Sequence, residues 1–177
     1  LKKYPQMVKN IVLLGAMDPK NGDAGFFSQE ELKLFTQKND EVAIFEGRPE
    51  VKEEIKKAGL DKPTLTSKEQ DKLRFIQGAA GDIYNIQRWQ QRFAFIVNIE
   101  SASATMQSTD FRYDWSSRLA AHPFSITIIN GEYDFPVGLK GNPIWKRVIA
   151  TEVKNVSLVE LPKAGHLSWI DEPELFR

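Results

Sequence analysis

Two β-rich apolar runs near the C-terminus, joined by a segment with helical signals, constrain the fold of this chain most strongly. The runs cover residues 124–130 (Phe-Ser-Ile-Thr-Ile-Ile-Asn) and 156–161 (Val-Ser-Leu-Val-Glu-Leu). Between them, Pro143 suits the first position of a helix and Asn142 its N-cap, which predicts a helix over residues 143–153. Consecutive strands joined through a helix lie parallel in one sheet. The sequence therefore predicts an α/β fold.

A third strand is predicted near the N-terminus. Residues 8–15 end in the continuous run Ile-Val-Leu-Leu before a glycine, which is typical of a strand buried on both faces. The long, mostly helical segment that follows exceeds an ordinary crossover connection. We therefore expect residues 1–17 and 111–177 to form a partial α/β core. Residues 18–110 should form an inserted, all-helical cap subdomain over the C-terminal ends of the strands.

Sequence patterns place several helices in the cap. Ser28 and Ser67 are each followed three residues later by a Glu or Gln, the capping-box pattern that opens a helix. A charged helix over residues 49–59 follows a Gly-Arg-Pro break. The charged residues at positions 52–57 of this helix are expected to form a solvated face with i,i+4 ion pairs.

The end of the cap is predicted to hold a long aromatic helix. Gly78-Ala79-Ala80-Gly81 is interpreted as an interruption, followed by a helix over residues 83–99. Residues 100–110 could extend this helix or form a loop. Aromatic side chains would cover one broad side of it, as a packing face or as the wall of a substrate pocket: Tyr84, Trp89, Phe93 and Phe95.

An acid and a histidine directly follow the two C-terminal strands. Gly131-Glu132-Tyr133-Asp134 comes after the first, and Gly165-His166 after the second. The carboxyl ends of parallel strands meet at one edge of a sheet, so Asp134 and His166 are predicted to form an acid–base pair there. The two glycines are expected to let the chain turn sharply.

Two shorter helices are also predicted, over residues 111–119 and from residue 171 to the end.

Composition excludes several classes of function. Lys plus Arg and Asp plus Glu number 24 each, so no global charge favours nucleic acid or a membrane surface. No apolar run is long enough to span a membrane. The sequence has no Cys and 2 His, which excludes disulfides and cysteine catalysis. Two His without Cys do not predict a metal site, although carboxylates could contribute one. Lack of Cys fits a reducing compartment and equally a secreted protein. The cytoplasm is slightly favoured, but no N-terminal targeting signal is observable, so the compartment is not predicted.

These motifs, in this order and spacing, resemble the α/β-hydrolase superfamily from its sixth strand to just past its last. The resemblance implies that Asp134 is the triad acid and His166 the triad base, with no cofactor. The position of the cap and the start of the chain are most similar to proline iminopeptidases and related aminopeptidase-like serine hydrolases. The matching segments are Tyr4-Pro5, Ile11 to Gly15, Gly131 to Asp134, Gly165-His166, and Asp171-Glu172-Pro173-Glu174-Leu175-Phe176.

Other titratable residues offer alternatives to this pair. Glu132 is a rival acid, but the resemblance places the acid at Asp134. Asp18 lies where some members of the superfamily carry an alternative acid, yet an Asp before a proline is more readily explained as a loop residue. His122 fits a surface or packing role. An aminopeptidase of this kind would need cap carboxylates to bind a substrate ammonium, and residue type alone suggests Asp82, Glu100 and Asp110.

No segment of the sequence reads Gly-x-Ser-x-Gly or resembles the His-Gly-Gly oxyanion loop. We therefore expect the chain to be the C-terminal fragment of a longer or processed hydrolase and to hydrolyse nothing alone. Expected partners are a small-molecule or short-peptide substrate, and either the missing N-terminal half or a second copy at an exposed strand edge. The alternatives are a fragment of another capped hydrolase (esterase, epoxide hydrolase or dehalogenase) and a non-catalytic binding or assembly module.

Overall fold

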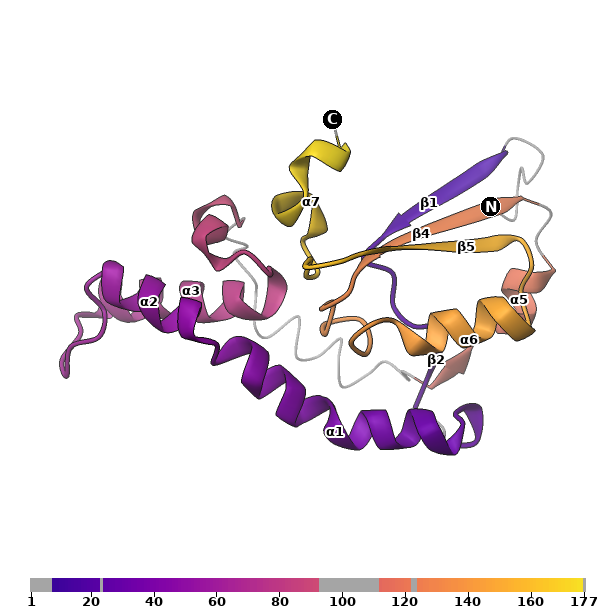
Figure 1. The fold of residues 1–177 in the computed structure, drawn as a ribbon, viewed down its shortest axis with the longest axis horizontal. Coiled ribbons are helices and arrows are strands. Elements are labelled where there is room, and N and C mark those ends of the chain that lie inside the picture. The colour runs from indigo at the N-terminus through magenta and orange to yellow at the C-terminus, as the bar shows by residue number, and fades with distance from the viewer. Residues whose placement is uncertain (1–7, 23, 93–111, 122–123, 177) are drawn as a thin grey trace.

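The computed structural model describes residues 8–22, 24–92, 112–121 and 124–176, and it has an α/β architecture (Figure 1). Its main sheet holds three parallel strands in the order β1-β4-β5: β1 (Asn10–Leu14), β4 (Ser125–Gly131) and β5 (Val156–Leu161). The three predicted strands and their parallel arrangement are therefore confirmed.

One face of the sheet is covered by α6 (Pro143–Thr151), which lies between β4 and β5 in the sequence. Ile144, Trp145 and Val148 of this helix pack into one core with Ile126 and Ile128 of β4. Pro143 occupies the first turn, where a missing N–H costs nothing. The predicted helix is confirmed, and it ends two residues earlier than expected.

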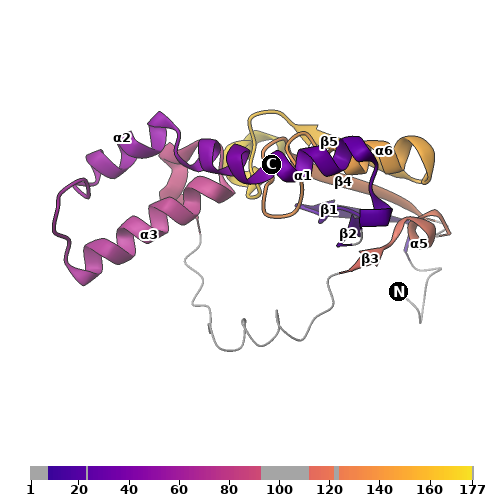
Figure 2. The same cartoon turned by 90° about the horizontal axis from the view of Figure 1, so that it is seen from below.

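The helical segment begins with α1 (Gln29–Glu46) and α2 (Pro49–Lys57). It continues with α3 (Ser67–Asp82) and the 3-10 helix η3 (Ile86–Gln91). Two views show α1 running past α6, while α2 and α3 project beyond the ends of the strands (Figures 1 and 2). Its own core contains buried side chains of α2, α3 and η3, together with Leu167 and Ile170. The predicted domain boundaries at residues 17/18 and 110/111 stay a prediction.

The cap sequences are explained by hydrogen bonds at the helix starts. Ser28 forms the predicted capping box with Glu31. The second box lies one residue earlier than predicted: Thr66, not Ser67, is the N-cap, and Glu69 is its partner. Lys62 adds a charged contact of 2.6 Å to Glu69, which favours this register over one with Gln70. On the charged face of α2, Lys57 pairs with Glu53 at i,i+4, as predicted.

The predicted interruption at residues 78–81 and the long helix over residues 83–99 are wrong. Helix α3 continues through residues 78–81 to Asp82, and residue 83 is extended. After it only η3 is helical within residues 83–92. The reason is tertiary: the amides of Tyr84 and Asn85 donate to the side chain of Asp171, 86–87 residues away. Residues 93–111, with Phe93 and Phe95, lie outside the described residues.

Two smaller predictions need correction. The helix expected over residues 111–119 is shortened, because Tyr113–Asp114 forms β3 against β2 (Lys20–Asn21) before α5 (Ser116–Ala120) begins. The closing helix splits into α7 (Ser168–Asp171) and the 3-10 helix η4 (Pro173–Phe176). Glu172 separates them with a non-helical backbone because the residue before a proline avoids the α region.

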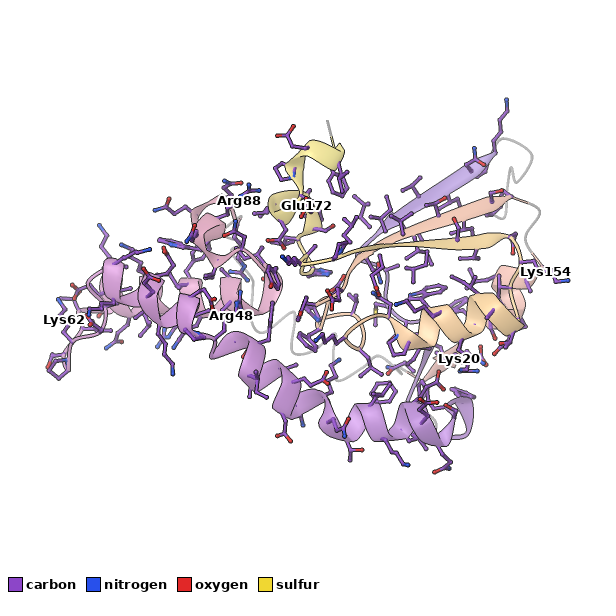
Figure 3. All side chains as sticks on the ribbon, in the orientation of Figure 1. Lys20, Arg48, Lys62, Arg88, Lys154 and Glu172 are labelled. Carbon is purple, nitrogen blue, oxygen red and sulfur yellow. The ribbon has the colours of Figure 1, made fainter. Side chains whose placement is uncertain are left out.

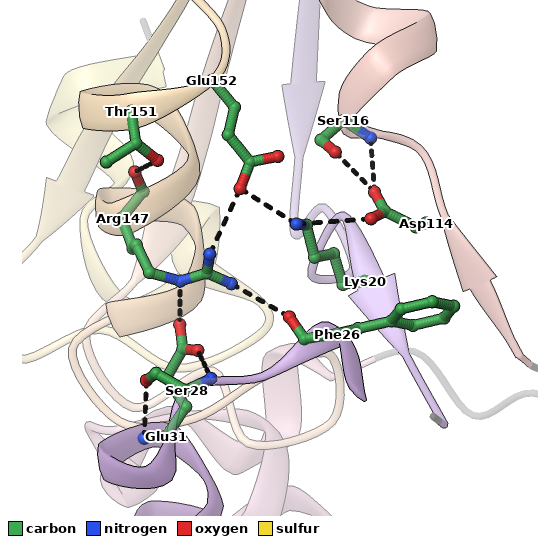
Figure 4. A network of polar contacts seen from close by, with 9 residues as sticks. All are labelled: Lys20, Phe26, Ser28, Glu31, Asp114, Ser116, Arg147, Thr151 and Glu152. Atoms are coloured by element: carbon green, nitrogen blue, oxygen red, sulfur yellow. Dashed lines mark hydrogen bonds and ion pairs between the residues drawn. The ribbon is translucent and has the colours of Figure 1, made fainter. Parts of the chain in front are cut away.

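A polar network joins α1 to α6 (Figure 4). Arg147 of α6 contacts Glu31 at 2.6 Å and Glu152 at 3.2 Å, and Glu152 also pairs with the buried Lys20 at 2.9 Å. Asp114 contacts the same lysine at 3.3 Å. Thus a buried cation is balanced by two carboxylates from distant segments. None of the helices in the described ranges is long and apolar enough to cross a membrane.

Candidate active site

The structure brings Asp134 and His166 together at the C-terminal edge of the sheet. Asp134 lies three residues after β4, and His166 five residues after β5. Their Oδ1 and Nδ1 atoms are 2.9 Å apart. The Asp134 side chain is 1 % exposed, whereas the imidazole is 31 % exposed. A buried carboxylate therefore orients a histidine that reaches the surface.

Backbone hydrogen bonds between the two loops hold this pair in place. The amides of Glu132 and Tyr133 donate to the carbonyls of Leu161 and Ala164. Gly131 and Gly165 have ordinary negative φ angles, so the expected sharp turns do not account for them. A Cβ at position 131 would lie 2.3 Å from the Ala164 carbonyl oxygen. The close approach of the two loops is what requires glycine.

Gly15 lies directly against the imidazole ring of His166. It follows β1 with a φ of +58°, and a Cβ built there would lie 2.9 Å from Cε1 and 3.0 Å from Nδ1 of His166. Only glycine combines this backbone conformation with this contact. The sequence identified Gly15 as a strand end but gave no sign that it faces the histidine.

The geometry fixes the chemistry of His166. A carboxylate only accepts hydrogen bonds, so Nδ1 carries the proton and Nε2 is left as the basic nitrogen. The hydrogen bond to Asp134 raises the pKa of His166, partial burial opposes this, and the charges of Asp134 and Asp82 add to the increase. Such a histidine can accept a proton from a nucleophile, and the carboxylate stabilises the imidazolium that forms.

Asp18 is a second carboxyl group buried near this site. It is 6 % exposed, and burial, together with the charges of Asp134 and Glu31, raises its pKa to about 7, although Lys38 opposes this. The Asp134 Oδ2 atom is itself buried without a hydrogen-bond donor among the described residues. Asp18 is thus not a solvated turn residue. It adds a titratable group beside the pair.

Two asparagines that the sequence analysis did not assign to the site fix its scaffold. Asn130 is buried at the end of β4, where its side chain exchanges two hydrogen bonds with the backbone of Ala16, at 2.8 and 3.0 Å. Asn142 occupies the predicted N-cap position, but its side chain makes no capping bond. It instead donates to Gly131 O and to Glu160 and accepts from Asn130. Together they tie the ends of the three strands to one another. In the sequence, Asn130 could have been singled out as a polar residue at the end of an apolar run.

The remaining candidates make other contacts or lie outside the described residues. Glu132 accepts from the backbone of Lys163 at 3.4 Å, and Asp82 pairs with Arg92 at 2.7 Å. Tyr84 stacks near Tyr133, with ring centroids 5.0 Å apart, and so packs against the loop that carries Asp134. Outside the described residues lie His122, Glu100 and Asp110.

Hollows flank the two loops. One of about 460 Å³ is lined by aromatic rings of Phe45, Tyr84, Tyr133 and Phe135, and one of about 290 Å³ lies beside it, next to Asp171. Across the described ranges, no three His, Cys, Asp or Glu side chains gather in a way that could hold a metal ion.

Comparisons with known proteins find similar solved structures only. No family model and no curated protein matches the sequence. Among solved structures, the chain is similar to the α/β-hydrolase enzyme MGS-M2 from a Medee basin deep-sea metagenome library, with 16% identity over 98% of this chain and a TM-score of 0.45. It is also similar to a thermophilic esterase from Thermogutta terrifontis, with 15% identity over 99% and a TM-score of 0.47.

A further similar structure is Est816, described as an N-acyl homoserine lactone degrading enzyme, with 16% identity over 99% of this chain and a TM-score of 0.46. The chain spans 55% to 57% of the length of these three structures. At these identities and TM-scores, the assignment of an α/β fold rests on the sheet and helices described above.

Proposed function

We propose that this chain supplies the acid and the base of a serine hydrolase of the α/β-hydrolase type. Asp134 would hold the proton-bearing Nδ1 of His166, and Nε2 would take the proton of a serine hydroxyl as it attacks an acyl carbon. The single observation that carries the proposal is the 2.9 Å contact between the buried carboxylate and a half-buried imidazole at the carboxyl edge of a parallel sheet.

The nucleophile is proposed to come from a polypeptide segment outside these 177 residues, since the sequence holds no Gly-x-Ser-x-Gly. The chain alone would then hydrolyse nothing. The resemblance of the sequence favours a proline iminopeptidase-like aminopeptidase as the first specificity to test, with short-chain esters as the second. An epoxide hydrolase or dehalogenase would follow if the nucleophile were an aspartate.

The experiment combines the chain with the segment that carries the nucleophile and measures the release of naphthylamine from proline β-naphthylamide and of nitrophenol from p-nitrophenyl acetate. We expect turnover only from the combination, and a loss of about 10³-fold or more in Asp134→Ala and His166→Ala. Glu132→Ala is the matched control, because it removes the neighbouring carboxylate and should leave turnover unchanged. Turnover that survives both substitutions, or none from the combination, would overturn the proposal.

A further inference from the structure

Another carboxylate, that of Asp171, contacts the loop that carries His166. Asp171, at the end of α7, is 8 % exposed and accepts three backbone hydrogen bonds. Its Oδ2 accepts from the amide of Gly165 at 2.8 Å and from that of Tyr84 at 2.9 Å, and its Oδ1 accepts from the amide of Asn85 at 2.8 Å. One side chain therefore binds both the residue before the histidine and the turn after α3.

The residue after the histidine is held to the same turn. The amide of Leu167 donates to the carbonyl of Asp82 at 2.9 Å. His166 thus lies between Gly165, whose amide donates to Asp171, and Leu167, whose amide donates to Asp82. The loop also lies directly against this turn, because a Cβ at Gly165 would lie 2.6 Å from the same Asp82 carbonyl oxygen.

Arginines stabilise this buried charge. Arg88 of η3 reaches the C-terminal end of α7 and donates to the carbonyls of Ile170 and Asp171, the latter at 3.1 Å. Figure 3 shows Arg88 on the cap side facing the segment that carries Glu172. The negative charge of Asp171 also acts on Arg48. Burial lowers the pKa of Arg48, and the charge of Asp171 is one of several that oppose this decrease. Three N–H donors and two nearby cations therefore surround the carboxyl group of Asp171.

An amide side chain could not replace this carboxylate. Asparagine has one acceptor oxygen, so its NH₂ group would face at least one backbone N–H that is now bonded. A donor pressed against a donor in a buried position costs free energy and displaces the backbone. The segment most exposed to that displacement is Gly165 to Leu167, because it carries bonds on both sides of the histidine.

We propose that Asp171 is a positioning residue that sets the place of His166 by binding Gly165 and the turn at Tyr84 and Asn85 together. The imidazole meets Asp134 only while this three-way contact holds, so the cap segment and the histidine loop move as one unit. The catalytic consequence rests on the proposed function, but the effect on the imidazole does not.

The first test follows the imidazole by NMR. The sequence has two histidines, so His122 is an internal reference for the titration of His166. We expect Asp171→Asn to lower the pKa of His166 toward the ordinary 6.5, because its contact with Asp134 loosens. Glu172→Gln is the matched control: it removes the next carboxylate, whose side chain lines the hollow of about 290 Å³, and should change neither titration. A folded Asp171→Asn protein in which His166 titrates as before would overturn the proposal.

The second test uses the unchanged chain, so it stands even if Asp171→Asn fails to fold. In amide hydrogen exchange, Gly165, Tyr84 and Asn85 should be protected and should open with one common free energy, because a single carboxylate binds all three amides. Clearly different opening free energies, or no protection at Gly165, would contradict the three-way contact.

If the proposed hydrolysis is reconstituted, Asp171→Asn should lower kcat by about 10-fold to 100-fold with little change in KM, since a displaced base affects the chemical step rather than binding. An equal loss for Glu172→Gln would contradict the assignment. Absence of any hydrolysis would defeat the proposed function alone, because the imidazole titration would still decide the role of Asp171.

Discussion

At the scale of single residues, the position of the imidazole depends on two contacts, a hydrogen bond to Asp134 and the close approach of Gly15. Asp134 provides the lateral hydrogen bond, and Gly15 provides the surface on which the ring rests. Both supports lie just after strands of the sheet, Gly15 directly after β1 and Asp134 three residues after β4. A general base gains from such support because a small displacement of the reacting atom costs a large factor in rate.

Gly15→Ala should displace His166. A non-glycine residue in the left-handed region costs about 1–2 kcal/mol, and here the new methyl group would also press on Cε1. We expect a lower free energy of unfolding in urea, and an NMR titration in which the pKa of His166 moves toward 6.5. Gly59→Ala is the matched control: its φ is +69°, but its Cβ would meet nothing within 4 Å. It should lose stability without affecting the histidine, and an equal effect of both variants on His166 would contradict the role of Gly15.

Asp18→Asn should raise stability at neutral and alkaline pH. The pKa of Asp18 is raised from 3.8 to about 7 in the folded chain, so folding favours its protonated form. The stability that the protonated form contributes is fully present below pH 3.8 and is lost as the pH rises toward 7. The loss corresponds to at most about 4 kcal/mol, a figure that already includes the opposing charge of Lys38.

The measurement is urea unfolding of both proteins from pH 4 to pH 9. The advantage of Asp18→Asn should be near zero at pH 4 and should grow up to about pH 7, because the amide is never charged. A constant difference across the range, or one that is largest at pH 4, would show that burial of a charge at this position is not what limits stability.

At the scale of elements, the attachment of α1 to α6 depends on Glu31. Its carboxylate caps its own helix by accepting from the amide of Ser28 at 2.7 Å, and it binds Arg147 at 2.6 Å. Burial by itself would raise the pKa of Glu31, but the hydrogen bonds from Arg147 and Ser28 outweigh it and the pKa lies below its usual value.

Glu31→Gln should therefore cost about 1–3 kcal/mol of unfolding free energy at pH 7, the usual range for a buried charged hydrogen bond. Because the pKa of Glu31 is lowered on folding, this contribution is present above pH 4.5 and disappears as the pH falls below it. Thermal unfolding at pH 7 and pH 3 checks both statements. Glu30→Gln, at the exposed neighbouring position in the same first turn, should have almost no effect.

Elements whose signals are local were predictable from the sequence. The capping box at Ser28, the proline at the start of α6 and the apolar runs of β4 and β5 each specify their element through nearby residues. The juxtaposition of Asp134 and His166 also followed, because parallel strands end at one edge.

Features set by distant contacts were not predictable. Gly78 to Gly81 look like a break, yet α3 passes through them because this part of the helix is packed: Ala79 and Ala80 are completely buried. The aromatic helix expected after it does not form at Tyr84 and Asn85, since Asp171 binds their amides. Asp171 itself was interpreted as a helix start. Nothing in its local sequence shows that its carboxylate reaches back by 86–87 residues.

At the scale of the whole molecule, the two faces of the sheet differ. Helix α6 covers one, as Figure 1 shows. On the other, the strand register places Leu14, Ile129 and Val159 in one row across the three strands. Leu14 and Val159 are 45% and 44% exposed, and Val12, two residues along β1, is 60% exposed. Parallel sheets are ordinarily covered on both faces, and β1 has β4 as its one strand neighbour within the described residues.

We therefore expect the isolated chain to associate through this open face, either with a second copy or with the segment proposed to carry the nucleophile. In sedimentation velocity, the apparent mass should rise with concentration above the 20.2 kDa of one chain. Val159→Lys should shift the protein toward the monomer, because a charge placed among apolar side chains resists burial. Ile44→Lys is the matched control, since it removes a side chain that is 74% exposed on α1, away from the sheet. A chain that stays monomeric at every concentration, or an equal effect of the two substitutions, would show that the open face is not the contact surface.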